Sequence, residues 1–176
     1  VLSIAHPSYA LRTLSRTSAT TFVFATPTTT PSIASPTAPS VVATGSGGTP
    51  KTHTYSVTSV SADGEESLPL SAGSASLDLT VAGNYVTIDW TASAGALYCN
   101  VYKTTGGSTG FIGRADAGGP FVDDNIVPDY TRVFPQVDYT LVTAGYYPGA
   151  VSYHEQRKVV GGSTTLPNAF YASVLG

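Results

Sequence analysis

Several residue types are scarce in this chain, and each scarcity limits what the protein can be. The 176 residues include no methionine and one cysteine, Cys99, so no disulfide can form within the chain. Because methionine is absent, we expect a fragment of a longer translation product. Because no internal disulfide can form, we expect its stability to depend on core packing. The lack of disulfides also favours a protein made in a reducing cytoplasm.

Charged residues are few as well. They make up 11% of the chain, against roughly 25% in ordinary globular domains. Residues 36–135 hold four basic residues and nine acidic ones, a poor match for phosphates, which bind mainly to Lys and Arg. We therefore exclude sequence-specific DNA recognition.

No apolar run approaches the roughly 18 residues of a membrane span, and the chain does not begin with a signal-peptide pattern, so membrane insertion is not expected.

The residues that are present predict an all-β fold. Tyr, Val and Thr abound, and no stretch of a dozen residues has apolar side chains at helical spacing. Val86, Ile88 and Trp90 alternate with polar residues, as in a half-buried strand, so Trp90 is predicted to lie in the core. The same alternation in residues 97–102 puts Leu97, Cys99 and Val101 on one face and Tyr98, Asn100 and Tyr102 on the other, with both faces partly covered.

Turn signals and composition divide the chain into four parts. Residues 1–25 contain short strands, and residues 26–38 form a Pro- and Thr-rich linker. Residues 39–135 are predicted to be a small antiparallel sandwich, with Val41-Val42-Ala43 as its first edge strand and hairpin turns at Ala62-Asp63-Gly64 and Gly106-Gly107. Residues 136–176 are a second β segment.

Catalysis is not predicted. His6, His53 and His154 are widely separated, and none belongs to a recognisable nucleophile or zinc motif. Cys99 is expected to be a small buried hydrophobe, because no neighbouring cation is present to activate its thiol. We assign no catalytic residue and no cofactor.

One loop has the residue types of a cation site. Asp123-Asp124-Asn125, with Asp129 nearby, supplies the oxygens that Ca²⁺ prefers, although the spacing is not that of an EF-hand. Ordinary turn chemistry, in which such side chains bond to their own backbone, is the favoured interpretation, and we assign no metal ligand. Glu65-Glu66 is expected to be a solvated hairpin.

The C-terminal segment is rich in aromatic residues, which we divide between core and subunit contacts; they are Tyr146, Tyr147, Tyr153, Phe170 and Tyr171. Arg157 and Lys158 are expected to be solvated. The alternative is that they face a lumen or pair with a carboxylate of a neighbouring subunit. Arg12 and Arg16 share one face of an extended segment, where they would brace it.

Two flanking motifs resemble one protein family. Residues 146–162 read Tyr-Tyr-Pro-Gly-Ala-Val-Ser-Tyr-His-Glu-Gln-Arg-Lys-Val-Val-Gly-Gly and are followed by Leu166-Pro167-Asn168. Residues 1–17 combine a hydrophobic strand, His6-Pro7 and an Arg-x-Leu-x-Arg element. Together they resemble the tail nozzle proteins (tail tubular protein B) and tail-hub proteins of short-tailed bacteriophages. The resemblance implies that both segments belong to a larger bladed β platform.

The central segment resembles a second fold. Residues 55–69 look like the last strand pair of a fibronectin type III domain, and residues 86–121 look like its Trp strand and the following Tyr-x-x-Val-Tyr strand. The order is reversed relative to that family, which implies a permuted immunoglobulin/fibronectin type III-like sandwich inserted between the platform pieces. This departure leaves the strand-by-strand correspondence open.

The phage resemblance implies a structural role without catalysis. Six copies would form a ring or tube in the virion tail, assembled in the host cytoplasm, through which genomic DNA passes non-specifically. Its partners would be the adaptor and portal-side tail proteins and the tail fibres, with the insert facing outward. The alternative is a carbohydrate-binding or adhesion module, in which Tyr98, Tyr102 or Tyr146 stacks on sugars and the Asp123 loop holds calcium. A third possibility is an accessory domain of a hydrolase.

Overall fold

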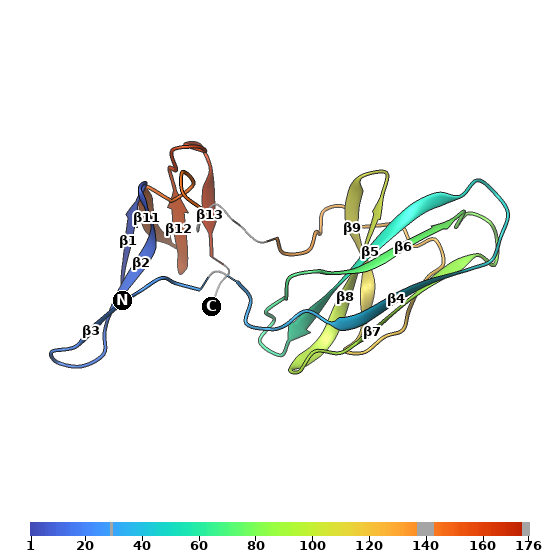
Figure 1. Cartoon of the computed structure of the whole chain (residues 1–176), viewed down its shortest axis with the longest axis horizontal. Coiled ribbons are helices and arrows are strands. Elements are labelled where there is room, and N and C mark those ends of the chain that lie inside the picture. Colours follow the sequence, from blue (N-terminus) through green and yellow to red (C-terminus); the bar gives the residue numbers. More distant parts are fainter. Residues whose placement is uncertain (29, 137–142, 174–176) are drawn as a thin grey trace. The chain divides into compact units, whose positions relative to one another are not determined.

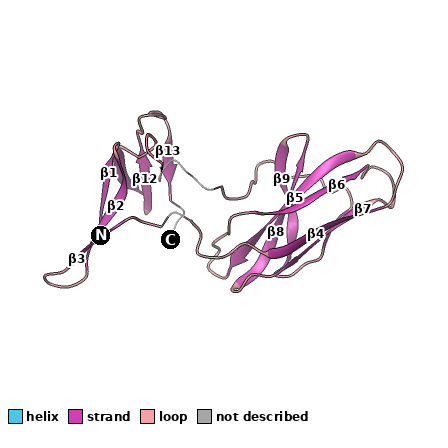
Figure 2. Ribbon diagram, viewed as in Figure 1, coloured by secondary structure: helices cyan, strands magenta, loops and turns pink. Residues whose placement is uncertain are grey.

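The prediction of an all-β protein is confirmed. The computed structural model describes residues 1–28, 30–136 and 143–173, and this part of the chain contains strands and turns but no helix (Figure 2). The strands are β1 Leu2–His6, β2 Tyr9–Arg16, β3 Phe22–Ala25, β4 Thr37–Thr44, β5 Lys51–Ser61, β6 Leu70–Leu77, β7 Tyr85–Thr91, β8 Ala96–Thr105, β9 Ser108–Asp116, β10 Phe121–Asp123, β11 Ala150–His154, β12 Arg157–Gly161 and β13 Phe170–Ala172 (Figure 1).

The chain forms two compact units. The central unit is Thr30–Gln136, and the flanking unit combines Val1–Thr29 with Val137–Gly176. The central unit has two antiparallel sheets, ordered β10-β7-β4 and β6-β5-β8-β9. Their inward faces share one apolar core, made of Tyr55, Val57, Ala72, Ala75, Leu77, Leu79, Val86, Ile88, Trp90, Cys99, Val101 and Ile112.

The predicted alternation positions most of this core. Val86, Ile88 and Trp90 are buried on β7, and Cys99 is fully buried on β8, as predicted. The opposite face of β8 is also covered, because Tyr102 packs edge-on against the ring of Phe134. The prediction for Leu97 is wrong, since its side chain is 61% exposed. The pairing of β8 with β5 shifts register between Val60 and Ser61, beside the start of β8, and the alternation of its buried face does not extend to Leu97.

Glycine turns define the central hairpin. β8 and β9 are joined by Gly106-Gly107 alone, with φ angles of 60° and 84°. Positive φ at both positions is the mirror-image type I turn that matches the twist of paired strands. The predicted hairpin is confirmed. Val41-Val42-Ala43 lies within β4, which is an edge strand, as predicted.

The flanking unit brings together the two ends of the described chain. Its sheets are β1-β2-β3 and β11-β12-β13, both antiparallel. The Ser3 hydroxyl lies 2.8 Å from the Tyr153 hydroxyl, which links β1 to β11. Among its described residues Leu11 and Val160 are buried, whereas larger apolar side chains such as Phe22, Phe24 and Phe170 are exposed.

Candidate functional site around Asp123

Asp123 is the last residue of β10 and points into the core. It pairs with Val86 of β7, and Phe121, two residues earlier, pairs with Ile88. Side chains two apart on a strand share a face, and both β7 partners on this face are fully buried. The carboxylate is therefore placed among apolar side chains and is itself fully buried.

Two side chains from the opposite sheet contact one oxygen of this carboxylate. Lys103 Nζ lies 2.8 Å from Asp123 Oδ2, and the Tyr55 hydroxyl donates to the same oxygen at 2.8 Å. Tyr55 and Lys103 are cross-strand neighbours on β5 and β8. Lys103 also donates to the carbonyl of Ile126 at 2.7 Å. The ion pair therefore joins the two sheets of the central unit.

The other oxygen is held by the backbone just after β10. Asp123 Oδ1 accepts the amide hydrogens of Asn125 at 3.1 Å and Ile126 at 2.8 Å. Asn125 has a φ of 85°, a left-handed conformation that Asn tolerates better than most residues. With four donors the carboxylate is fully satisfied, which a buried charge requires.

The buried charges act on neighbouring titratable groups. Burial, and then the negative charge of Asp123, raise the pKa of Tyr55 above its ordinary value, so this residue keeps its proton. Burial, and then the positive charge of Lys103, lower the pKa of His53. The Nδ1 atom of His53 lies 2.8 Å from Thr105 Oγ1, and within the described residues its buried Nε2 has no hydrogen-bond partner.

The acidic residues considered for calcium are not brought to one point. Asp123 is already paired with Lys103, and Oδ1 of Asp129 accepts hydrogen bonds from the backbone and hydroxyl of Thr131 at 3.0 and 2.6 Å. The residues that the structure describes contain no group of three His, Cys, Asp or Glu side chains that could hold a metal ion. The turn chemistry favoured above is confirmed for Asp123 and Asp129.

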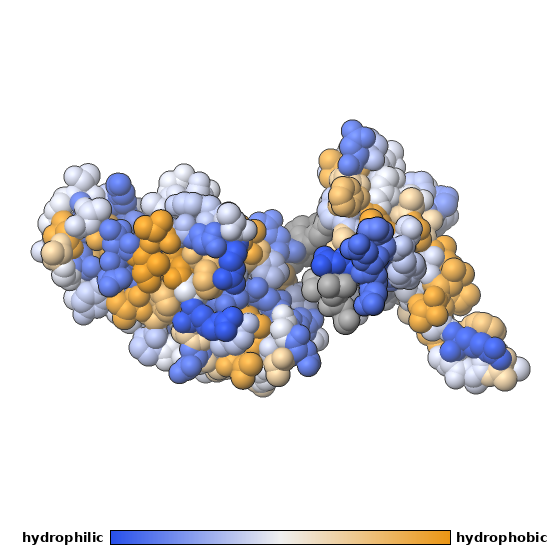
Figure 3. Space-filling model, turned by 180° about the vertical axis from the view of Figure 1, so that it is seen from behind, coloured by the Kyte–Doolittle hydropathy of each residue, from blue (hydrophilic) through white to orange (hydrophobic). Residues whose placement is uncertain are grey.

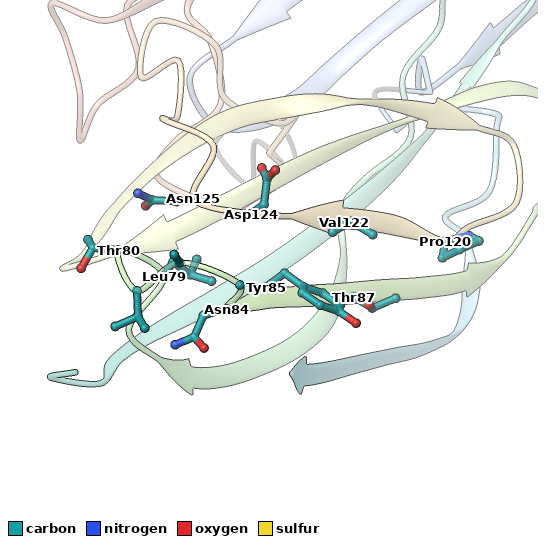
Figure 4. Close-up of a pocket in the computed structure, with 12 residues that line it drawn as sticks. Leu79, Thr80, Asn84, Tyr85, Thr87, Pro120, Val122, Asp124 and Asn125 are labelled. Carbon is teal, nitrogen blue, oxygen red and sulfur yellow. The ribbon is translucent and has the colours of Figure 1, made fainter. Parts of the chain in front are cut away.

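Asp124 and Asn125 are among the residues that line an open groove beside β7. The groove measures about 820 Å³, and its wall includes Tyr85 and Thr87 of β7 and Val122 of β10. In Figure 4, Asp124 and Asn125 follow β10, across the groove from the loop that carries Leu79 and Asn84. A groove lined by an aromatic ring and a few polar side chains is a common arrangement for binding small ligands.

Glu66 occupies a second polar cluster on the outer face of the larger sheet. Its Oε1 accepts hydrogen bonds from Asn100 at 3.0 Å and Tyr102 at 2.7 Å, and also from Thr58. The expectation that Glu66 is solvated is therefore wrong, although Glu65 is exposed. Burial, and then the hydrogen bond to Glu66, raise the pKa of Tyr102.

The remaining candidates are scattered. His6 and His154 are exposed, and His154 lies 3.8 Å from Glu155. Tyr98 is covered by the Arg114 guanidinium, 3.6 Å from its ring centre. Tyr102 is 2% exposed and has no face free for a sugar. Burial raises the pKa of Cys99.

Sequence reasoning missed the partners of Asp123. Lys103 lies two and four residues after Val101 and Cys99, so the alternation that placed those residues inside also placed Lys103 inside. The sequence therefore did indicate a buried Lys103. Because a fully buried Lys is almost always paired, a buried acidic partner was to be expected. Nothing in the sequence named Asp123 as that acid.

Comparisons of the chain with protein-family models, with curated proteins and with solved structures give no match. No helix long and apolar enough to cross a membrane occurs among residues 1–28, 30–136 and 143–173.

Proposed function

We propose that this chain is a structural part of the tail of a short-tailed bacteriophage, a nozzle or hub protein without catalytic activity. Copies of it would form a ring, a hexamer by family resemblance, for the passage of genomic DNA. The proposal places it in the virion after assembly in the host cytoplasm, in contact with adaptor and portal-side proteins and with tail fibres.

The apolar edge strand β3 is the observation that carries this proposal. Phe22, Val23 and Phe24 are 58%, 45% and 59% exposed, and β3 lies at the edge of its sheet. Figure 3 shows apolar side chains gathered on the arm that carries β2 and β3. An exposed apolar edge is a template for pairing with another strand, which soluble monomers normally avoid. In a subunit that is permanently assembled, such an edge strand would be covered by a neighbouring subunit.

The arrangement of the units also supports the proposal. β1 and β11 lie in one unit, although they come from opposite ends of the chain, and the central unit is inserted between them. This is the organisation that the tail-protein resemblance implies. For the central unit we propose a permuted fibronectin type III-like sandwich, supported by its two sheets and its buried Trp90. Low charge suits a channel that must not hold DNA tightly.

Electron microscopy of the protein, alone and with its co-purifying partners, tests the proposal. A ring or tube with sixfold symmetry would support it, and a monomer that never assembles would refute it. Phe22→Ser/Phe24→Ser should weaken assembly, because both side chains lie on one face of β3. Val127→Ser is the matched control, since Val127 is 83% exposed but belongs to the central unit.

A carbohydrate-binding module is the second candidate. The groove supports it, because its lining includes the aromatic ring of Tyr85 together with the polar residues Asp124 and Asn125. None of the tyrosines first considered, Tyr98, Tyr102 and Tyr146, lines this groove, so Tyr85 is the residue proposed to stack on a sugar there. Saturable binding of a glycan by the chain, abolished by Tyr85→Ala, would favour this function over assembly.

A further inference from the structure

Lys103 and Asp123 hold opposite charges in the interior of the central unit. Their side chains are 4% and 0% exposed, and Nζ lies 2.8 Å from Oδ2. Removing two charges from water is costly, and their mutual attraction often fails to repay that cost. A reaction that converts both charged groups into one neutral group would remove this cost altogether.

We propose that Lys103 and Asp123 condense into an intramolecular amide, an isopeptide bond that joins β8 to β10 and so links the two sheets covalently. The inference does not depend on the proposed function. It assigns a chemical role to a buried pair that neither a tail subunit nor a glycan-binding module requires.

The surroundings of Asp123 Oδ1 favour attack on the carboxyl carbon. Nζ lies 2.8 Å from Oδ2, which is bonded to Cγ, so the amine is held next to the carbon that it would attack. The negative charge of the tetrahedral intermediate then develops on Oδ1. That oxygen already accepts two backbone amide hydrogens, from Asn125 and Ile126, which is the arrangement of an oxyanion hole.

The surroundings of Oδ2 favour its departure as water. Within the ion pair the ammonium group transfers one proton to Oδ2, and the neutral amine attacks Cγ to form the C–N bond. A second proton moves from nitrogen to Oδ2, directly or through the Tyr55 hydroxyl, which donates to this oxygen. The C–Oδ2 bond breaks and one water leaves. The ammonium and the carboxylate thus become an amide and water, with no oxidant and no added reactant.

Two neighbours position the amine. The carbonyl of Ile126 accepts a hydrogen bond from Nζ, and Tyr55 faces Lys103 across the β5–β8 pairing. Tyr55 keeps its proton because burial and the charge of Asp123 raise its pKa. It therefore remains a donor to the leaving oxygen, and we class it as a positioning and proton-relaying residue.

Intact mass spectrometry of the whole chain under denaturing conditions tests the proposal. The purified protein should be lighter than its sequence by one water molecule. Fragmentation of a protease digest should recover the peptide of Lys103 joined to the peptide of Asp123. A folded wild-type protein that keeps its full sequence mass after prolonged incubation would overturn the inference.

Three variants test the assignment of this bond and the role of Tyr55. Lys103→Arg retains the positive charge but should not form the bond, so its mass should equal that of its sequence. If the wild type lost water by cyclisation of an aspartate elsewhere, the Lys103→Arg variant would still be lighter by one water. Asp124→Asn is the matched control and should form the bond as the wild type does. Tyr55→Phe should form it more slowly, and an unchanged rate would refute the role of Tyr55. Because the cross-linked peptides are sought in the wild type itself, the test does not depend on the folding of any variant.

Discussion

Replacing Asp123 by alanine should destabilise the central unit more than almost any other single change. The substitution leaves Lys103 charged and unpaired in the core and removes the acceptor of the Tyr55 hydroxyl and of two backbone amides. Breaking one partner of a buried ion pair costs about 3–5 kcal/mol. Single domains are stable by only about 5–15 kcal/mol, so a large part of the total would be lost.

Trp90 provides the assay. It is the one tryptophan of the chain and lies in the core of the central unit, so its fluorescence follows the unfolding of that unit. The free energy of unfolding falls by about 2 kcal/mol per molar urea, so the loss of about 3–5 kcal/mol should lower the urea concentration at the unfolding midpoint by about 1.5–2.5 M. An isopeptide bond in the wild type would increase the difference, because a cross-link also constrains the unfolded chain.

Asp124→Ala is the matched control, since Asp124 is the exposed neighbour of Asp123. Its effect should stay within about 0.5 kcal/mol, as for most surface substitutions. The reasoning is refuted if Asp123→Ala costs less than about 1 kcal/mol, or if both alanine variants are destabilised equally. Either result would mean that the buried contacts are not formed in solution.

Three further predictions concern other parts of the central unit. Cys99 should react slowly with a thiol reagent at pH 8 in the folded protein and rapidly in urea, because burial raises its pKa. Gly110→Ala should cost about 1–3 kcal/mol by urea unfolding, because a Cβ there would lie 2.8 Å from Pro128 Cβ. His53 has a lowered pKa when folded, so the unfolded chain binds the proton more tightly. Stability should therefore fall as pH decreases below about 6.5, and His53→Asn should flatten this dependence in urea midpoints measured from pH 5 to 7.5.

Strands with a clear period of two were predictable from the sequence. Val86, Ile88 and Trp90 alternate without interruption, and burial follows that pattern residue by residue. Gly106-Gly107 likewise determines its hairpin, because few other residues tolerate positive φ at both positions. Local rules such as these need no knowledge of the rest of the chain.

Features that depend on distant partners were not predictable. Leu97 continues the apolar alternation of β8 but is exposed, because a register shift against β5 ends the pattern beside it. Glu66 is held by Asn100 and Tyr102, which lie more than thirty residues away in the sequence. In each case the deciding contact lies on another strand, and the residue's own neighbours give no sign of it.

The position of Asp123 suggests why a chain with so few charges places two of them in its core. β10 is a strand of three residues with a single neighbour, β7, so its ladder provides few hydrogen bonds to fix its place. Apolar contacts alone are tolerant of small shifts, whereas a carboxylate held by an ion pair with Lys103 and by three hydrogen bonds admits one register. The same directed contacts that hold β10 in place also hold Lys103 Nζ against the Asp123 carboxyl group. Precise alignment of these groups is the condition that amide formation requires, so the structural role of the pair leads directly to its proposed chemistry.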